Sequence, residues 1–146
     1  MSLILQGVRP RHLDWWSWVL TVVLLAAGLS GRPAAFRAAV ALSAWQIVHF
    51  AWRTRSLGAL PVQVRIGYTI LLGISIFIPW LFWLPAIGTT ALVTVGYCPL
   101  ARFLLLMPWN RRVRLSPDFV GRVFLSPPGP GSILRHPRLE GMVRTR

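Results

Sequence analysis

The sequence contains very little negative charge and no lysine. Among its 146 residues only three are acidic, against 16 basic residues that are all arginine, so the formal net charge is +13. None of the acidic residues, Asp14, Asp118 and Glu140, lies inside a long apolar stretch. This absence weighs against paired carboxylates for acid–base catalysis. It also weighs against a proton- or cation-coupled transporter, whose path normally carries a buried carboxylate.

Cysteine and histidine are scarce as well. The single cysteine, Cys98, excludes a disulfide within the chain. The three histidines, His12, His49 and His136, lie far apart in different sequence environments. The sequence has no glycine-rich phosphate loop, and no group of histidine, cysteine and acidic residues has the spacing of a metal site. We therefore expect neither enzymatic activity nor a bound metal.

The chain has instead long stretches without any charge. Residues 66–101 form an uninterrupted uncharged run. A single helix of that length would measure about 54 Å, whereas the hydrocarbon core of a bilayer is about 30 Å thick. Pro79 and Pro85 lie near the middle of the run, with Trp80 and Trp83 beside them. We therefore interpret the run as two membrane spans folded back on each other.

Two further apolar stretches precede this run. The first follows Arg9 and Arg11, as in a secretory signal peptide, but its bulky tryptophans and the lack of a small-x-small cleavage site favour a retained span. We expect spans over residues 15–31, 38–52, 65–79 and from 85 to about 98–102. The sequence thus predicts an all-α polytopic membrane protein with four transmembrane helices in two hairpins. Residues 1–110 would form this domain, and residues 111–146 an irregular tail rich in arginine and proline.

The placement of arginine predicts how the chain crosses the membrane. With four spans, the N-terminus, the second loop and the tail share one side, and these segments hold 13 arginines. Only Arg32 and Arg37 fall on the other side, while Arg102 lies at the border. The positive-inside rule then places both termini in the cytoplasm. Tryptophans near both expected interfaces agree with this threading.

Short surface helices are expected after the last span. Pro99 should kink or end that span, and residues 100–107 are too few to cross a bilayer, so we expect an interfacial helix that carries Arg102. Ser116 and Pro117 have the pattern of a helix cap followed by proline at the first position. The helix that they start would have one apolar face, formed by Phe119, Val120, Val123 and Phe124. Beyond residue 126 the proline- and glycine-rich sequence predicts no regular structure.

His49 is the strongest candidate for a cofactor-binding residue. Ser43, Gln46, His49 and Arg53 recur at intervals of three and four residues, which predicts one polar stripe on the second span. Such a stripe must face protein or water rather than lipid. One interpretation is axial ligation of a haem or bacteriochlorophyll by His49. The interpretation that we favour is hydrogen bonding between helices, with no cofactor bound, because no second ligand is apparent.

Small residues and Cys98 have structural interpretations. Gly88 and Gly96, with other glycines and alanines, would let helices pack closely within the bundle or against a neighbouring protein. Cys98 lies four residues from Arg102, which could activate a thiolate. The lack of a second cysteine favours a structural role.

The basic tail is expected to contact lipid headgroups or a partner protein. The candidate contact residues are Arg102, Arg111, Arg112, Arg114 and Arg122. Each arginine close to an anionic membrane surface contributes about 1 kcal/mol of attraction. An acidic face of a partner protein would serve equally well. A nucleic-acid partner is not expected, since the tail has no basic helical stripe and no interleaved aromatic residues.

One sequence motif has a counterpart in known proteins. The stretch Gly96-Tyr-Cys-Pro-Leu-Ala-Arg102, followed by Pro108-Trp-Asn-Arg111, resembles a group of small uncharacterised inner-membrane proteins of proteobacteria. Its Gly-x-Cys-Pro-Leu core is also similar to a two-helix membrane domain of unknown function, sometimes attached to rhodanese domains. The resemblance covers about a third of the chain, around the third and fourth spans. It implies a bacterial inner membrane and brings no activity with it.

These features together predict a non-catalytic accessory subunit of a larger inner-membrane complex, photosynthetic or respiratory. One alternative is a haem- or bacteriochlorophyll-binding protein that uses His49. Another is a small carrier or channel with a polar cavity, which would be lined by Ser43, Gln46, His49, Thr90 and Thr94.

Overall fold

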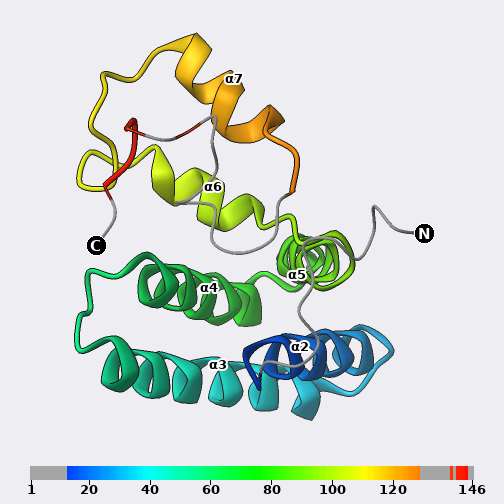
Figure 1. The fold of residues 1–146 in the computed structure, drawn as a ribbon. Coiled ribbons are helices and arrows are strands. Elements are labelled where there is room, and N and C mark those ends of the chain that lie inside the picture. The colour runs from blue at the N-terminus through cyan, green and yellow to red at the C-terminus, as the bar shows by residue number, and fades with distance from the viewer. Residues whose placement is uncertain (1–12, 129–138, 140, 145–146) are drawn as a thin grey trace.

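The described part of the chain is all-helical, as the sequence predicts. The computed structural model describes residues 13–128, 139 and 141–144. Within these residues there is no β-strand. The helices are α2 (Leu13–Leu29), α3 (Pro33–Thr54), α4 (Leu60–Phe77), the short 3₁₀ helix η1 (Pro79–Phe82), α5 (Trp83–Val95), α6 (Pro99–Leu105) and α7 (Pro117–Leu125) (Figure 1).

Proline in the first turn marks the start of α3, α4, α6 and α7. Proline suits this position because its ring presets a helical φ and its missing N–H needs no partner there. Ser116 caps α7 as predicted, since its Oγ accepts a hydrogen bond of 3.2 Å from the Phe119 N–H. At the other end of α5, Gly96 adopts a left-handed φ of 72°, which glycine reaches without steric cost, and ends the helix.

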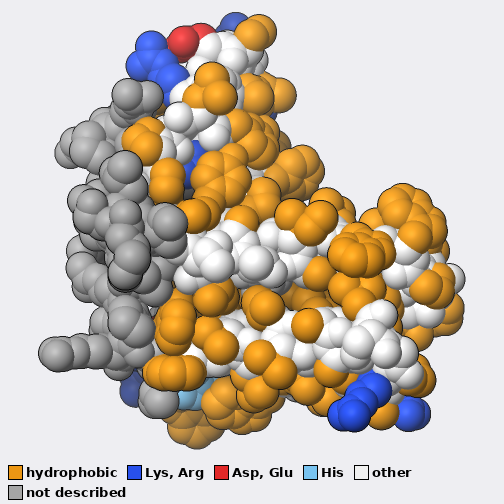
Figure 2. Space-filling model, turned by 90° about the vertical axis from the view of Figure 1, so that its right-hand side faces the viewer, with side chains coloured by type: hydrophobic (Ala, Val, Ile, Leu, Met, Phe, Trp, Pro, Cys, Tyr) orange, Lys and Arg blue, Asp and Glu red, His pale blue; other side chains and the backbone are white. Residues whose placement is uncertain are grey.

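Two or three helices are long and apolar enough to cross a membrane. α3 and α4 each satisfy this condition, and a third span is possible if α5 and α6 count as one broken span. α2 is apolar but shorter, and the 13 residues of α5 would measure about 20 Å, which is less than the hydrocarbon thickness. The membrane character is therefore supported, but the four separate spans in two hairpins are not confirmed. Hydrophobic side chains cover most of the described surface in Figure 2, and arginines gather towards its upper and lower ends.

The last apolar segment is bent rather than straight. The segment from η1 through α5 meets α6 at 98°. In Figure 1, α5 is seen end-on whereas α3 lies across the view, so α5 crosses the α3–α4 hairpin steeply instead of lying along it. α6 then turns back to pack against α4. The short helix expected over residues 100–107 is thus confirmed as α6.

One core lies between α2, α3, α4 and η1. Its buried members are Trp18, Leu25, Ala39, Tyr68, Leu72 and Phe82. The rings of Phe36 and Phe82 stack at 3.6 Å, nearly parallel, and fix η1 against the start of α3. Ala86, Leu92 and Val93 of α5 pack against the same core, so α5 is joined to these helices.

A second core joins the tail to the helices. It contains Leu60 and Val64 of α4, Ala101 and Leu105 of α6, Phe119 and Val123 of α7, and the tail residues Leu139 and Val143. The backbone amide of Arg112 donates to Met142 O at 2.8 Å, and that of Arg144 donates to Asn110 O at 2.8 Å. The predicted boundary at residue 110 therefore runs through a shared core. The proline- and glycine-rich residues 129–138 lie outside the described residues.

Gly28 offers a test of the packing between α2 and α3. A Cβ atom at Gly28 would overlap the Phe36 ring, which cannot move freely because it stacks on Phe82. We expect Gly28→Ala to lower the free energy of unfolding by about 1–3 kcal/mol, as overpacked sites do. Thermal unfolding in detergent measures it.

Gly73→Ala in α4 is the matched control, because a Cβ atom there meets nothing within 4 Å. Alanine favours a helix over glycine by up to about 1 kcal/mol, so this variant should be as stable as the natural protein or more stable. Equal melting temperatures for the two variants would contradict the close approach of Gly28 and Phe36.

Candidate functional site

The segment from Gly96 to Arg102 forms a joint between α5, α6 and α7. After Gly96 ends α5, Tyr97 donates a hydrogen bond of 3.0 Å from its hydroxyl to Phe124 O in α7. Cys98 is the N-cap of α6, because its Sγ accepts from the Ala101 N–H at 3.4 Å. We call residues 96–102 the joint. The Tyr97 hydroxyl thus connects the joint to α7, and the Cys98 thiol caps α6.

Arg102 is the central residue of the joint. Its side chain is only 2% exposed. Its Nη1 donates to the carbonyl of Val123 and, at 3.4 Å, to that of Phe124, and its Cζ lies 4.1 Å from the centroid of the Tyr97 ring. Both carbonyls belong to the last turn of α7, where the helix dipole is negative and unpaired carbonyls need donors. Arg102 therefore binds the C-terminus of α7 instead of facing lipid or a partner, which corrects the predicted placement.

Asn110 connects the end of α6 to the start of α4. Its Nδ2 donates to Gln63 Oε1 at 2.7 Å and to Leu104 O at 2.9 Å. Trp109 Nε1 donates to the same Gln63 oxygen at 3.0 Å, and Gln63 Nε2 donates to Gly58 O at 2.6 Å. Because the Asn110 carbonyl also accepts from Arg144, this residue ties three segments together. Residues 96–102 of the sequence motif thus contact α7, and residues 108–111 contact α4, α6 and the tail.

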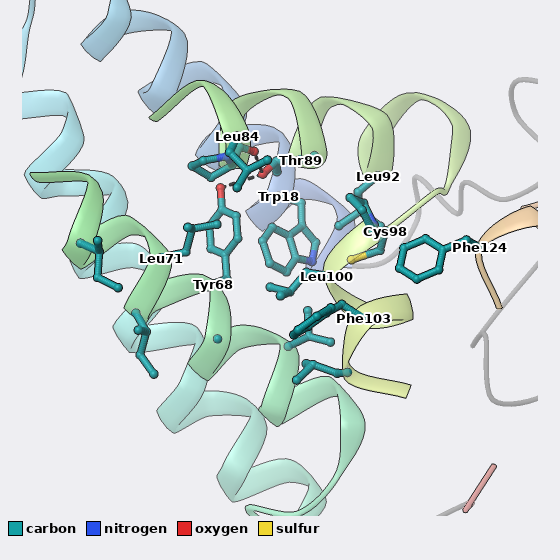
Figure 3. Close-up of a pocket in the computed structure, with 18 residues that line it drawn as sticks. Trp18, Tyr68, Leu71, Leu84, Thr89, Leu92, Cys98, Leu100, Phe103 and Phe124 are labelled. Atoms are coloured by element: carbon teal, nitrogen blue, oxygen red, sulfur yellow. Dashed lines mark hydrogen bonds between the residues drawn. The ribbon is translucent and has the colours of Figure 1, made fainter. Parts of the chain in front are cut away.

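An apolar groove of about 570 Å³ lies between α4, α5 and α6 (Figure 3). Trp18, Tyr68, Leu71, Leu84, Thr89, Leu92, Cys98, Leu100, Phe103 and Phe124 are among its lining residues. The hydroxyl groups of Tyr68 and Thr89 are hydrogen-bonded to each other at 2.7 Å, so they offer little polarity to the interior. The groove exists because α5 diverges from α4. No feature of the sequence predicted it.

Arg65 is a second buried arginine. It belongs to α4, its side chain reaches α2 and α3, and it is 5% exposed. Its Cζ lies 3.3 Å from the centroid of the Phe50 ring and 5.4 Å from that of Trp18, an arrangement that stabilises a desolvated cation. Its Nη1 donates to Pro61 O at 2.9 Å, but its Nε has no hydrogen-bond partner.

The predicted polar stripe on α3 is divided between two environments. Ser43 and Gln46 are buried against α4, where Ser43 Oγ lies 2.6 Å from Thr69 Oγ1. Both amide atoms of Gln46 lack a hydrogen-bond partner. His49 and Arg53 are exposed instead. At 100° per residue, His49 lies about 120° around the helix from Ser43, so the stripe is too wide to face one neighbour.

His49 is stacked on an exposed tryptophan. Its ring lies 5.2 Å from that of Trp45, with an angle of 18° between the planes, and Trp45 is itself largely exposed. Thr90 and Thr94, expected beside His49 in a polar cavity, donate to carbonyls of their own helix α5 and are also exposed. The five residues suggested for a carrier pathway are therefore not brought together.

The remaining candidate residues are arginines of the tail and two glycines. Arg112, Arg114 and Arg122 are exposed, and Arg111 is partly buried. Arg122 forms an ion pair of 2.9 Å with Asp118 one turn away. A Cβ atom at Gly88 would lie 3.4 Å from Pro99, so Gly88 does allow α5 and α6 to approach closely. Gly96 is the residue that ends α5.

Side chains that bind metal ions are scattered over the described residues. These residues contain no group of three histidine, cysteine or acidic side chains that could hold a metal ion. The groove contains no acid–base pair. Comparisons of the chain with family models, with curated proteins and with solved structures gave no match.

Replacing Arg102 should release α7. In Arg102→Gln the carbonyls of Val123 and Phe124 lose their charged donor, a loss of about 1.5–3 kcal/mol. We expect faster hydrogen exchange in α7 and at residues 139–144, with α2 and α3 unchanged. The control is Arg122→Gln, whose ion pair is solvent-exposed and contributes about 0–1 kcal/mol. Uniform exchange changes in both variants would contradict the capping role.

Replacing Asn110 should weaken the attachment of the tail. Asn110→Ala removes three side-chain hydrogen bonds and leaves Gln63 with fewer partners, which should destabilise the contact by about 1–3 kcal/mol. Limited proteolysis should then cut residues 139–144 sooner. Trp109→Phe removes only one exposed hydrogen bond and should have a much smaller effect. Equal cleavage rates in the two variants would argue against this role.

Proposed function

We propose that this chain is a non-catalytic accessory subunit of a larger complex in the bacterial inner membrane. The complex would be photosynthetic or respiratory, as small helical subunits of this kind are common in such assemblies. We further propose that both termini lie in the cytoplasm, with α2 and the broken α5–α6 segment completing the crossing made by α3 and α4. The excess of arginine in the tail supports this orientation.

The observation that carries the proposal is the outward position of His49 on α3. Polar side chains at membrane depth rarely face lipid, because hydrocarbon offers no hydrogen-bond partner. His49 is exposed and lies beside Trp45 and Trp52, which are 58% and 84% exposed. A neighbouring protein that covers this face would supply the missing partner. We call His49, Trp45 and Trp52 the α3 outer face.

Photo-crosslinking tests this interface directly. A photoreactive phenylalanine analogue in place of Trp45, in native membranes, should give one discrete protein adduct. The same analogue in place of Val23, an equally exposed residue of α2, should give mainly lipid adducts. In His49→Leu the adduct at position 45 should weaken several-fold, because the polar contact with the partner is lost. Lipid adducts alone at position 45 would refute the proposal.

A second candidate function is binding of a haem or bacteriochlorophyll by His49. The same exposure favours it, since an axial ligand must face the space that the pigment occupies. A pigment held between this chain and a neighbour would also cover Trp45. Visible absorbance of the complex from native membranes distinguishes the two functions: a band lost in His49→Leu supports ligation, and a colourless preparation excludes it.

A further inference from the structure

Two loops that are far apart in the sequence are joined at one end of the structure. Residues 55–59 connect α3 to α4, and residues 106–116 connect α6 to α7. Both loops lie at the left of Figure 1. Gln63 links them, because its Nε2 donates to Gly58 O at 2.6 Å and its Oε1 accepts from Trp109 Nε1 at 3.0 Å. We call the exposed surface of these two loops the loop face.

The loop face lies at the ends of the two longest apolar helices. α3 and α4 are each long and apolar enough to cross a membrane, and residues 55–59 connect them directly. A loop between two membrane-crossing helices lies at the bilayer surface, because the hydrocarbon core cannot satisfy its backbone polar groups. The hydrogen bonds of Gln63 hold residues 106–116 at the same level. The headgroup layer is therefore the surface next to the loop face.

The loop face is positively charged. Arg55, Arg112 and Arg114 are all exposed, and neither loop contains an acidic residue. Among the described residues, the two ion pairs involve Arg53 and Arg122 instead. The charges of the three arginines are therefore available to an anionic partner. Phosphate groups suit arginine well, since the guanidinium group can donate two parallel hydrogen bonds to their oxygens.

Apolar side chains are exposed between these charges. Leu57 is 68% exposed and Leu115 is 56% exposed, while Trp109 and Val113 are also exposed. An acidic protein surface would pair with the arginines but would offer no apolar counterpart to the leucines. The bilayer interface accepts both kinds of side chain, because phosphate groups lie beside the edge of the hydrocarbon there. The mixture of side chains thus favours lipid over an acidic protein.

We propose that the loop face binds the anionic headgroups of the adjacent leaflet. Lipid phosphates accept hydrogen bonds from Arg55, Arg112 and Arg114, and the side chains of Leu57 and Leu115 enter the boundary with the hydrocarbon. In the orientation proposed above this is the cytoplasmic leaflet. The lipid contact does not depend on the subunit role, so the tests of the loop face and the crosslinking at position 45 can succeed or fail independently.

The depth of a spin label at position 115 tests the proposal. The full-length chain with Cys98→Ser and Leu115→Cys is reconstituted into vesicles of phosphatidylcholine, with or without phosphatidylglycerol. Electron paramagnetic resonance compares collisions of the label with oxygen, which concentrates in the bilayer, and with a water-soluble nickel complex. We expect the oxygen-to-nickel ratio to be severalfold higher with phosphatidylglycerol and to fall in 1 M salt, where charges are screened beyond about 3 Å.

A label at position 57 should respond in the same way, because the two loops form one surface. An unchanged ratio there, beside a changed ratio at position 115, would contradict the shared loop face. Equal ratios at position 115 in the two kinds of vesicle would overturn the binding of anionic headgroups.

Two double variants with the same loss of charge provide the matched control. Each arginine near an anionic surface should strengthen the attraction about fivefold, so Arg112→Gln/Arg114→Gln should lower the ratio severalfold in phosphatidylglycerol vesicles. Arg32→Gln/Arg37→Gln removes two exposed arginines at the other end of α3 and should leave the ratio unchanged. Equal effects of the two variants would overturn the proposal. A discrete protein adduct from a photoreactive analogue at position 115 in native membranes would overturn the choice of lipid.

Discussion

The capping of α7 by Arg102 is the interaction on which the second half of the structure depends. An arginine that is only 2% exposed loses most of its hydration and persists only where strong acceptors and an aromatic surface replace water. The carbonyls of Val123 and Phe124 and the ring of Tyr97 provide this environment. In return the positive charge of Arg102 stabilises the carbonyl groups at the C-terminus of α7, a helix of only nine residues. A helix as short as α7 is not stable by itself, so it needs this contact.

The sharp turn at the joint explains both the attachment of the tail and the groove. Gly96 ends α5 in a left-handed conformation and Pro99 starts α6 at once, so the chain changes direction within three residues. α6 can therefore pack on α4 and present Ala101 and Leu105 to α7. The same turn keeps α5 from lying along α4, and the space between them becomes the groove. A straight fourth span would have removed both features.

The sequence predicted local structure well and long-range contacts poorly. Helix positions followed from proline, capping residues and apolar stretches, and the Ser116 cap and the short α6 were found in this way. The role of Arg102 was missed because its acceptors lie 21 residues further along the chain, and arginine beside an apolar run usually extends to the membrane surface. The contact of Gln63 with Asn110 joins residues 47 positions apart, and no periodic pattern indicates it. The groove depends on the 98° bend, and Pro99 indicated the position of this bend but not its angle.

The position of His49 shows a different limit. A spacing of three and four residues was read as one face, yet two successive steps of three rotate the side chain by about 120° in total, away from the first residue. Ser43 and Gln46 consequently point into the protein while His49 points out. The structure thereby divides structural polar residues from a candidate contact residue. Of these residues, only His49 and Arg53 are accessible from outside the chain.

The central claim is that the joint holds α7 and the tail in one fixed position on the α3–α4 hairpin. Electron paramagnetic resonance between spin labels at Leu57 and Leu125 measures this most directly, since both side chains are exposed. The labels are attached to cysteines introduced into a Cys98→Ser background, where serine can replace the α6 cap. The account predicts a single narrow distance distribution in lipid. A broad or multiple distribution would show that α7 moves independently and would contradict it.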